Sequence, residues 1–329
     1  MRLLPLTLAV TSILGLLPST QAANTHYGKE VPVKVESMYQ RGLKYLASSQ
    51  LSNGCWDDSS GHLPGAVSLS ILAFLASGED PNHGPYAKHI NRSIDYIIKS
   101  QQISTGYIGT CMYNHGFSTL ALAEAYGMVQ NPRIEQSLRK AVRLILKAQS
   151  KNSYGAWRYN PDSSDADTTI SGCQIVALLA ARNAGIDVPE SALYKAFEYL
   201  ETCRDSSGAY GYTSKNGAKV TLTAIALLCH QLQKKGSSPE MVQSLDFLKN
   251  KITYRDPHYT YYFEYYMSQA LFQADLDTWE IWNKQNIRLL SSTQQSNGSW
   301  LGNRGSSFST SSALLSLALN FRYLPIYEK

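Results

Sequence analysis

The sequence has few cysteines and lacks the short motifs of several large enzyme classes. Its 329 residues contain five cysteines, and no two are spaced as Cys-x-x-Cys, which argues against a zinc ribbon or a thioredoxin-like redox site. No Gly-x-Ser-x-Gly, P-loop or His-Glu-x-x-His is present, so nothing indicates a serine hydrolase, a nucleotide-binding protein or a zincin. We therefore expect no cofactor and no metal.

Charged residues are also scarce and are spread along the chain. They make up 17% of the sequence, and the net charge of +5 comes from 30 Lys and Arg against 25 Asp and Glu. No basic run with interleaved aromatic residues occurs. The composition therefore predicts an ordinary globular protein without a nucleic-acid partner.

The first residues have the layout of a secretory signal peptide. Arg2 precedes an apolar run from Leu3 to Leu17, and the small residues Thr20 and Ala22 follow. This layout predicts cleavage after about Ala22, and the run is shorter than the roughly 20 residues that a membrane span requires. We expect a signal peptide at 1–22, no transmembrane helix in the mature chain, and a secreted or periplasmic protein.

The rest of the chain repeats one pattern about six times. An amphipathic helix ends in Gln or Cys, a turn carries Gly and then an aromatic residue, and a more apolar helix follows, as in residues 41–56 and 64–77. The first four copies are 51, 48 and 54 residues apart, counted from the residues that end their amphipathic helices: Gln50, Gln101, Gln149 and Cys203. A period near 50 is typical of repeat architectures.

This alternation predicts an all-α fold in which twelve helices close into a double ring. The six apolar helices would form the inner barrel and the six amphipathic ones the outer layer of an α/α toroid. We expect one such domain at 35–329, after an N-terminal extension at 23–34. An open solenoid is the alternative, but neither end has the polar capping repeat that an open stack needs.

The repeated turns resemble the QW repeat of squalene-hopene cyclases. Residues 41–56 show its pattern of Arg/Lys-Gly, aromatic or Leu, Gln and Gly-x-Trp. The tracts 112–127, 155–186 and 261–272 are similar to exported bacterial proteins with prenyltransferase/squalene oxidase repeats, whose superfamily includes the β subunits of protein prenyltransferases. The resemblance covers the mature chain, and it implies an α/α toroid with any active site in the central cavity.

The starts of the apolar helices are the predicted location of the site. Each apolar helix follows a turn, so their N-terminal ends should meet at one mouth of the barrel, where positive helix-dipole ends favour anions. We expect binding residues among the polar side chains at these starts: Tyr113, His115, Arg158, Tyr159, Asp165, Asp167, Lys219, His258, Tyr259, Tyr262 and Glu264.

Two of these residues resemble a catalytic acid pair. Residues 165–169, Asp-Ala-Asp-Thr-Thr, are similar to the Asp-x-Asp-Asp-Thr motif of squalene-hopene cyclases, with Thr168 in place of the last Asp. The resemblance implies a proton donor at Asp167 and its partner at Asp165, acting on an isoprenoid-like substrate. A helix N-cap in a salt-bridged turn is the alternative role.

Alternative roles for these predicted site residues remain open. The stripe of Tyr259, Tyr262 and Tyr266 either faces the cavity or packs between helices. His115 and His258 with an aspartate would make a metal or acid–base set, and an aspartate with Glu264 would make the separated carboxylates of a carbohydrate-active barrel.

Two functions fit this sequence. In one, the central cavity binds an apolar or isoprenoid-like small molecule, with cyclase-like acid chemistry at Asp165 and Asp167. In the other, an exported, non-catalytic module binds a peptide, a glycan or a partner protein at the rim of the toroid.

Overall fold

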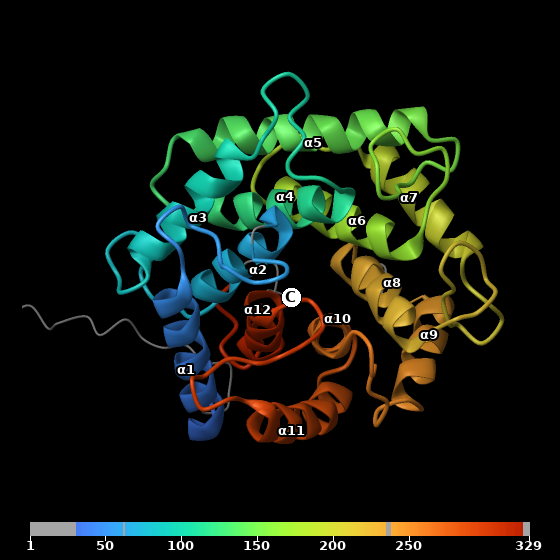
Figure 1. Ribbon diagram of the computed structural model, residues 1–329. Coiled ribbons are helices and arrows are strands. Elements are labelled where there is room, and N and C mark those ends of the chain that lie inside the picture. Colours follow the sequence, from blue (N-terminus) through green and yellow to red (C-terminus); the bar gives the residue numbers. More distant parts are fainter. Residues whose placement is uncertain (1–30, 62, 235–237, 325–329) are drawn as a thin grey trace, which may run out of the picture. The chain divides into compact units, whose positions relative to one another are not determined.

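The computed structural model describes residues 31–61, 63–234 and 238–324, and these residues form twelve α-helices and no β-strand (Figure 1). The outer helices are α1 (Val33–Ser49), α3 (Ala87–Lys99), α5 (Arg133–Lys151), α7 (Glu190–Thr202), α9 (Pro239–Lys249) and α11 (Leu276–Thr293). The inner helices are α2 (Pro64–Leu75), α4 (Met112–Tyr126), α6 (Thr168–Asn183), α8 (Val220–Leu232), α10 (Thr260–Ala274) and α12 (Ser306–Ala318). The predicted signal peptide lies outside the described residues.

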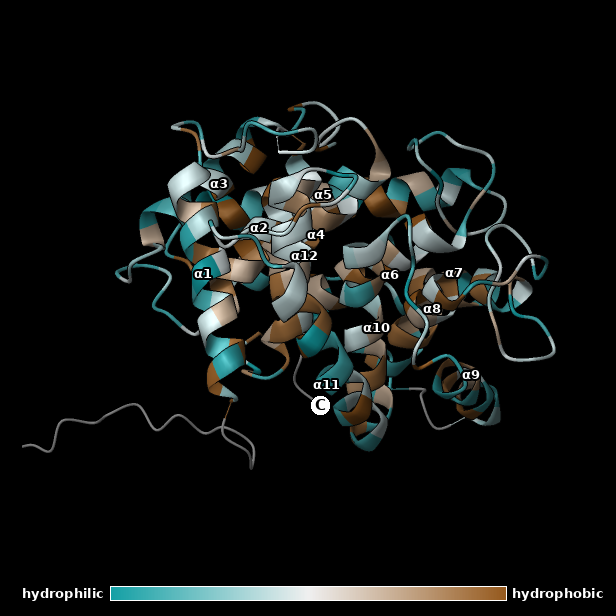
Figure 2. Cartoon of the chain, turned by 60° about the horizontal axis from the view of Figure 1, so that its bottom comes forward, coloured by the Kyte–Doolittle hydropathy of each residue, from teal (hydrophilic) through white to brown (hydrophobic). Residues whose placement is uncertain are grey.

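The two layers differ in how much of each helix is buried. Helix α2 is buried at every position, whereas α3 buries Ile90, Ser93, Ile94 and Ile97. That spacing of three and four residues is one face of a helix. Hydrophilic residues accordingly lie mainly on the outer helices and the loops (Figure 2). In the described part of the chain, no helix is both long and apolar enough to cross a membrane.

The ring closes, so the chain is an α/α toroid and not an open solenoid. Each inner helix packs against the next, and α12 returns to α2, while α1 packs against α11 and α12 (Figure 1). Asp58, in the loop after α1, accepts a hydrogen bond at 2.6 Å from the backbone N–H of Ser307 at the start of α12. The first and last repeats are thus joined by a capping bond as well as by packing.

The glutamine that ends an outer helix connects it to the following outer helix. Gln149 Nε2 donates to the carbonyl of Gly155 in its own turn at 2.6 Å and to the carbonyl of Ala192 in α7 at 2.7 Å. Equivalent pairs of bonds are made by three further glutamines: Gln50, Gln101 and Gln294. The amide therefore joins neighbouring repeats as well as bonding within its own turn.

The turn glycine is required because the next outer helix touches it. Gly54 has φ +96°, and a Cβ atom there would lie 2.2 Å from the carbonyl oxygen of Arg92 in α3. Gly298 has φ +92°, and its Cβ would lie 2.3 Å from the carbonyl oxygen of Arg41 in α1. Any larger residue would be strained and would push the two repeats apart.

The tryptophans of the turns are buried and have a structural role. Trp56, Trp157 and Trp300 are at most 2% exposed. Their indole N–H groups each donate at 2.9 Å to a carbonyl of the preceding outer helix: Leu46, Ile145 and Leu290. Each ring therefore fills the space under its turn while its polar atom is satisfied.

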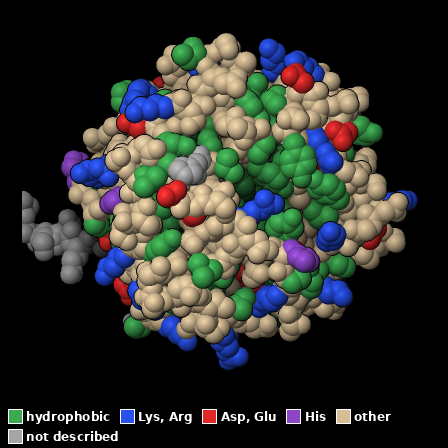
Figure 3. Space-filling model, viewed as in Figure 1, with side chains coloured by type: hydrophobic (Ala, Val, Ile, Leu, Met, Phe, Trp, Pro, Cys, Tyr) green, Lys and Arg blue, Asp and Glu red, His purple; other side chains and the backbone are tan. Residues whose placement is uncertain are grey.

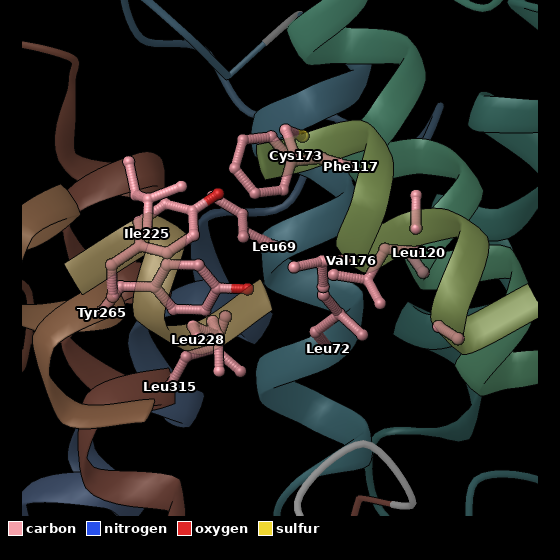
Figure 4. Close-up of a cluster of buried hydrophobic side chains, with 14 of the residues drawn as sticks. Leu69, Leu72, Phe117, Leu120, Cys173, Val176, Ile225, Leu228, Tyr265 and Leu315 are labelled. Carbon is pink, nitrogen blue, oxygen red and sulfur yellow. The ribbon is translucent and has the colours of Figure 1, made fainter. Parts of the chain in front are cut away.

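The interior of the barrel is filled with side chains. All six inner helices contribute to one buried cluster, shown in Figure 4: Leu69, Leu72, Phe117, Leu120, Cys173, Val176, Ile225, Leu228, Tyr265 and Leu315. Such packing leaves no continuous channel along this part of the axis.

The fifth repeat lacks the glutamine–glycine turn and is joined differently. Lys249 at the end of α9 forms an ion pair at 2.8 Å with Asp275, the N-cap of α11. Glu264 on α10 is fully buried beside Arg255, with 3.2 Å between Oε1 and Nε, and Arg255 lies 5.7 Å from the centre of the Trp282 ring on α11. Burial raises the pKa of Glu264 to about 8, because it outweighs the opposing effect of the Arg255 guanidinium.

We predict that Gln149→Glu destabilises the protein by about 2 kcal/mol or more. The change turns an amide donor toward two carbonyl oxygens into an acceptor in a buried position. Urea unfolding measures the difference, with Gln130→Glu at an exposed position as the matched control. Equal unfolding midpoints for the two variants would contradict this role of the glutamine.

We predict a pH-dependent stability that is lost in Glu264→Gln. The carboxyl's pKa rises on folding from about 4.5 to about 8, so the folded state holds a proton that the unfolded chain releases. Stability should fall as pH rises through that window, by at most about 4 to 5 kcal/mol.

Thermal unfolding between pH 5 and 9 tests this, with Glu135→Gln on the surface of α5 as the control. The Glu264→Gln variant should gain in stability relative to the wild type as pH rises. Parallel pH profiles for the two proteins would show that Glu264 is not the responsible group.

Candidate functional site

The N-terminal ends of the inner helices surround a cavity of about 900 Å³, which we call the cup. Every inner helix contributes lining residues: Ala66 (α2), Asn114 (α4), Thr169 (α6), Leu222 (α8), Tyr262 (α10) and Ser309 (α12). In the space-filling view, hydrophobic side chains gather around a hollow near the middle of one face (Figure 3). The inner helices therefore share one mouth, and the cup lies above the filled part of the barrel.

The structure brings most of the predicted binding residues together at this mouth. The lining includes Tyr113, Tyr159, Lys219, His258, Tyr259 and Tyr262. The deeper member of the tyrosine stripe, Tyr266, is buried in the barrel 4.9 Å from the Tyr262 ring. The stripe thus faces the cup at its upper end and packs between helices at its lower end.

His115 and Glu264 lie outside the cup, and Arg158, Asp165 and Asp167 are not in its lining either. The His115 ring is buried toward α5, where Nε2 lies 3.0 Å from the carbonyl of Ala141, while Nδ1 accepts the N–H of Ile108 at 3.1 Å. Burial lowers the pKa of His115 to about 4. The imidazole is therefore neutral, with its proton on Nε2, and it is used to fix the turn before α4.

Arg158 organises one edge of the cup. Its guanidinium carbon lies 5.4 Å from the ring centre of Tyr159 and 5.1 Å from that of Tyr212. The hydroxyls of these two tyrosines are 2.8 Å apart. Arg158 also pairs with Asp165 and Asp167, each at 3.3 Å. One cation therefore holds two lining tyrosines and both aspartates in place.

Asp167 is the N-cap of α6. Its Oδ1 accepts the N–H groups of Thr169 and Ile170, both at 2.9 Å, and the Thr169 hydroxyl at 2.6 Å. Burial raises the pKa of the Asp167 carboxyl, although these hydrogen bonds and Arg158 act in the opposite direction. The fully buried Asp167 thus combines a structural capping role with an increased affinity for a proton.

Asp165 is in a different environment from Asp167. Its side chain is 60% exposed, whereas that of Asp167 is fully buried, and the Arg158 guanidinium bonds to both carboxylates. Arg158 therefore bridges one carboxylate at the surface and one in the interior.

Aromatic rings line the inner wall of the cup. The Tyr113 ring centre is 6.0 Å from that of Tyr159 and 6.3 Å from those of Tyr262 and Phe117. Burial raises the pKa of Tyr113, so its hydroxyl stays neutral. Tyr159 and Tyr259 are 40% and 49% exposed, so part of each side chain is accessible to a ligand at the mouth.

Some lining residues were not among the predicted ones. Asp256 accepts the N–H groups of His258 and Tyr259 through Oδ1 and the Thr221 hydroxyl through Oδ2. The guanidinium of Arg304 lies 5.5 Å from the ring centre of Tyr259. The Asp-Pro-His turn at 256–258 is a recognisable loop signal, but nothing in the sequence places Arg304 beside Tyr259.

A metal site is not formed by the residues brought together here. Within the ranges that the structure describes, no group of three or more His, Cys, Asp or Glu side chains is arranged to hold a metal ion. The aspartates at the α6 edge are bonded to Arg158 and to backbone amides instead.

Solved structures with the same ring architecture belong to proteins of different activity. The alpha-1,6-mannanase GH76A of Salegentibacter sp. HEL1_6 matches 86% of this chain and 98% of its own, with a TM-score of 0.66 and 12% identity. An inactive variant of that enzyme in complex with alpha-1,6-mannotetrose has a TM-score of 0.68 at 10% identity, over 86% of this chain and 98% of its own.

A variant of the type II terpene cyclase MstE from Scytonema, in complex with geranylgeranyl dihydroxybenzoate, has a TM-score of 0.61 and 15% identity. It covers 89% of this chain and 99% of its own. At such low identities, these likenesses establish the α/α toroid alone.

The sequence itself gives a family without a described activity. No curated protein matches it. Residues 36–258, more than half of the chain, match a family described as a domain of unknown function, DUF6288. The protein is therefore a member of the DUF6288 family, built as an α/α toroid of the kind also seen in terpene cyclases and mannanases.

Proposed function

We propose that the protein binds a glycan in the cup, as a binding module without hydrolytic activity. The observation that carries this proposal is the pairing of accessible tyrosine faces with hydrogen-bonding groups at the mouth of a filled barrel. Tyr159 and Tyr259 present their rings, and Lys219, His258 and Asn303 line the same cavity. Sugars have apolar faces that stack on such rings and hydroxyls that bond to such neighbours.

The filling of the barrel below the cavity supports a ligand held at the mouth. Leu72, Leu120 and Leu228 belong to the cluster that fills the barrel below the cup (Figure 4). A long apolar chain would need that space to be enclosed against water, whereas a short oligosaccharide fits a cavity of about 900 Å³ that opens at the mouth of the barrel.

The carboxylates support binding without hydrolysis. Glycoside hydrolysis ordinarily uses two carboxyl groups on either side of the scissile bond. Among the described residues that line the cup, Asp256 is the one carboxylate, and both of its oxygens accept hydrogen bonds. The carboxylates that the sequence offered for a separated pair, Asp165 or Asp167 with Glu264, are not in the lining.

The fold comparison and the expected export agree with this proposal. The mannanase variant described above holds alpha-1,6-mannotetrose within the same type of toroid. The signal peptide expected at residues 1–22 would deliver the cup to a compartment where extracellular glycans are found.

We predict that Tyr259→Ala weakens oligosaccharide binding by about tenfold. The change removes an exposed ring at the mouth and the surface on which Arg304 lies. A glycan array identifies the best oligosaccharide, and isothermal titration then gives its affinity for each variant.

Tyr194→Ala is the matched control, because Tyr194 is 57% exposed on α7 and does not line the cup. It should bind as the wild type does. An equal loss in both variants, or no glycan binding by the wild type, would refute the proposed site.

Isoprenoid binding with acid chemistry is the second candidate, and the environment of Asp167 favours it. This carboxyl is buried with a raised pKa, and although it is not itself in the lining of the cup, it caps the helix whose Thr169 lines the cavity among aromatic rings. A protonated acid beside aromatic faces is the arrangement that protonation of an alkene requires. In this case, Asp167 would donate the proton to an isoprenoid-like substrate.

The variant Asp167→Asn separates the two candidates. Asparagine remains a good N-cap, so we expect the fold and glycan binding to persist. If the acid chemistry operates, turnover of polyprenyl substrates should fall by about 100-fold or more in this variant and far less in Asp165→Asn.

Native mass spectrometry of the purified protein complements this test by detecting any apolar passenger. Polyprenyl turnover that is unchanged in Asp167→Asn would exclude Asp167 as the acid. A retained isoprenoid in the wild type would instead count against a glycan as the natural ligand.

A further inference from the structure

The charges that line the cup are unequally distributed around the ring. On the side formed by α2, α4 and α6, the described lining residues carry no charge and include Tyr113, Phe117 and Asn114. On the side formed by α8, α10 and α12, they include Lys219, His258 and Arg304. Since α10 packs against both α8 and α12, these three basic residues occupy one continuous sector.

The negative charge in this sector is already engaged. Asp256 accepts two backbone N–H groups at 3.0 and 2.9 Å and the Thr221 hydroxyl at 3.1 Å. Lys219 and Arg304 together with this one aspartate leave one excess positive charge when His258 is neutral and two when it is protonated. Neither Lys219 nor Arg304 forms an ion pair with a side chain in the described ranges.

Arg304 is held in a position to bind an anion. Its guanidinium lies 5.5 Å from the ring centre of Tyr259, and stacking on the ring leaves its N–H edge free to bond. At the opposite edge of the cup, Arg158 stacks on two tyrosines but bonds to two aspartates. The two arginines are therefore alike in their stacking and different in their charge balance.

We infer that the cup selects acidic glycans, with the carboxylate or sulfate of one sugar bound in the sector of Lys219 and Arg304. This inference rests on the proposed glycan binding and adds the chemical class of the ligand. The apolar face of a sugar packs against the exposed tyrosines at the mouth, while the anion faces the sector of Lys219 and Arg304. Guanidinium groups bind both carboxylates and sulfates through paired N–H donors.

The test compares acidic tetrasaccharides with neutral partners of the same size and linkage. Suitable acidic probes are tetrasaccharides that contain galacturonate or glucuronate, and their neutral partners are the corresponding methyl esters. A sulfated tetrasaccharide is compared with its desulfated form. Titration at low ionic strength should give about tenfold tighter binding of an acidic member than of its neutral partner. The difference should shrink as salt is added.

Substitutions of the two cations test which side chains cause the preference for an acidic probe. Lys219→Met and Arg304→Gln should each weaken binding of the acidic probe about tenfold more than binding of its neutral partner, so that the preference for the acidic probe is lost. Lys215→Met is the control, since Lys215 is an exposed lysine in the loop before α8 that does not line the cup. Thermal melts confirm that each variant is folded.

The outcomes distinguish a failure of the acidic preference from a failure of glycan binding itself. Preference for a uronate or for a sulfate supports the inference and identifies which anion is recognised. If the neutral partners bind with equal or greater affinity, glycan binding stands but the preference for acidic glycans is overturned. Unchanged affinity of Lys219→Met and Arg304→Gln for the acidic probe overturns it as well. No binding of any oligosaccharide, neutral or acidic, overturns the proposed function together with this inference.

Discussion

In four of the six repeats a glutamine amide connects one outer helix to the next, and the ring depends on this interaction more than on any other. The two N–H groups of the amide bond to the carbonyl of a turn glycine and to a carbonyl of the following outer helix, as Gln149 does with Gly155 and Ala192. At the last repeat, Gln294 bonds to Met38 in α1, so the same contact that propagates the ring also closes it. Closure then places the starts of all six inner helices around one mouth.

Much of the fold could be predicted from the sequence, because each repeat carries the same local pattern. The period near 50 and the difference between apolar and amphipathic helices predicted twelve helices in two layers, and both are found. Asp167 was a recognisable N-cap. The directions in which the His115 and Glu264 side chains point were not predictable. Helices α4 and α10 are buried on nearly all sides, so their hydrophobic pattern does not show which face is turned toward the cup. The capping of Ser307 by Asp58 joins residues 249 apart in sequence and has no local signal.

The same ring supports different chemistries because the site is made by its loops and helix starts. A mannanase and a terpene cyclase share this architecture with the present chain at 10 to 15% identity. In this protein, a filled barrel lies below a tyrosine-lined cup. Its aspartates at the α6 edge are bonded to Arg158, and its unpaired cations lie on the opposite side. These features favour recognition at the mouth over chemistry in the centre.

Hydrogen–deuterium exchange with a bound oligosaccharide tests the central claim most directly, because it maps contact around the whole ring. If the ligand occupies the cup, exchange should slow together in peptides covering 111–117, 219–222, 256–262 and 301–309, which come from four different hairpins. The outer faces of α3, α5 and α7 should be unaffected. Protection confined to a single hairpin, or located on those outer faces, would contradict the shared binding site.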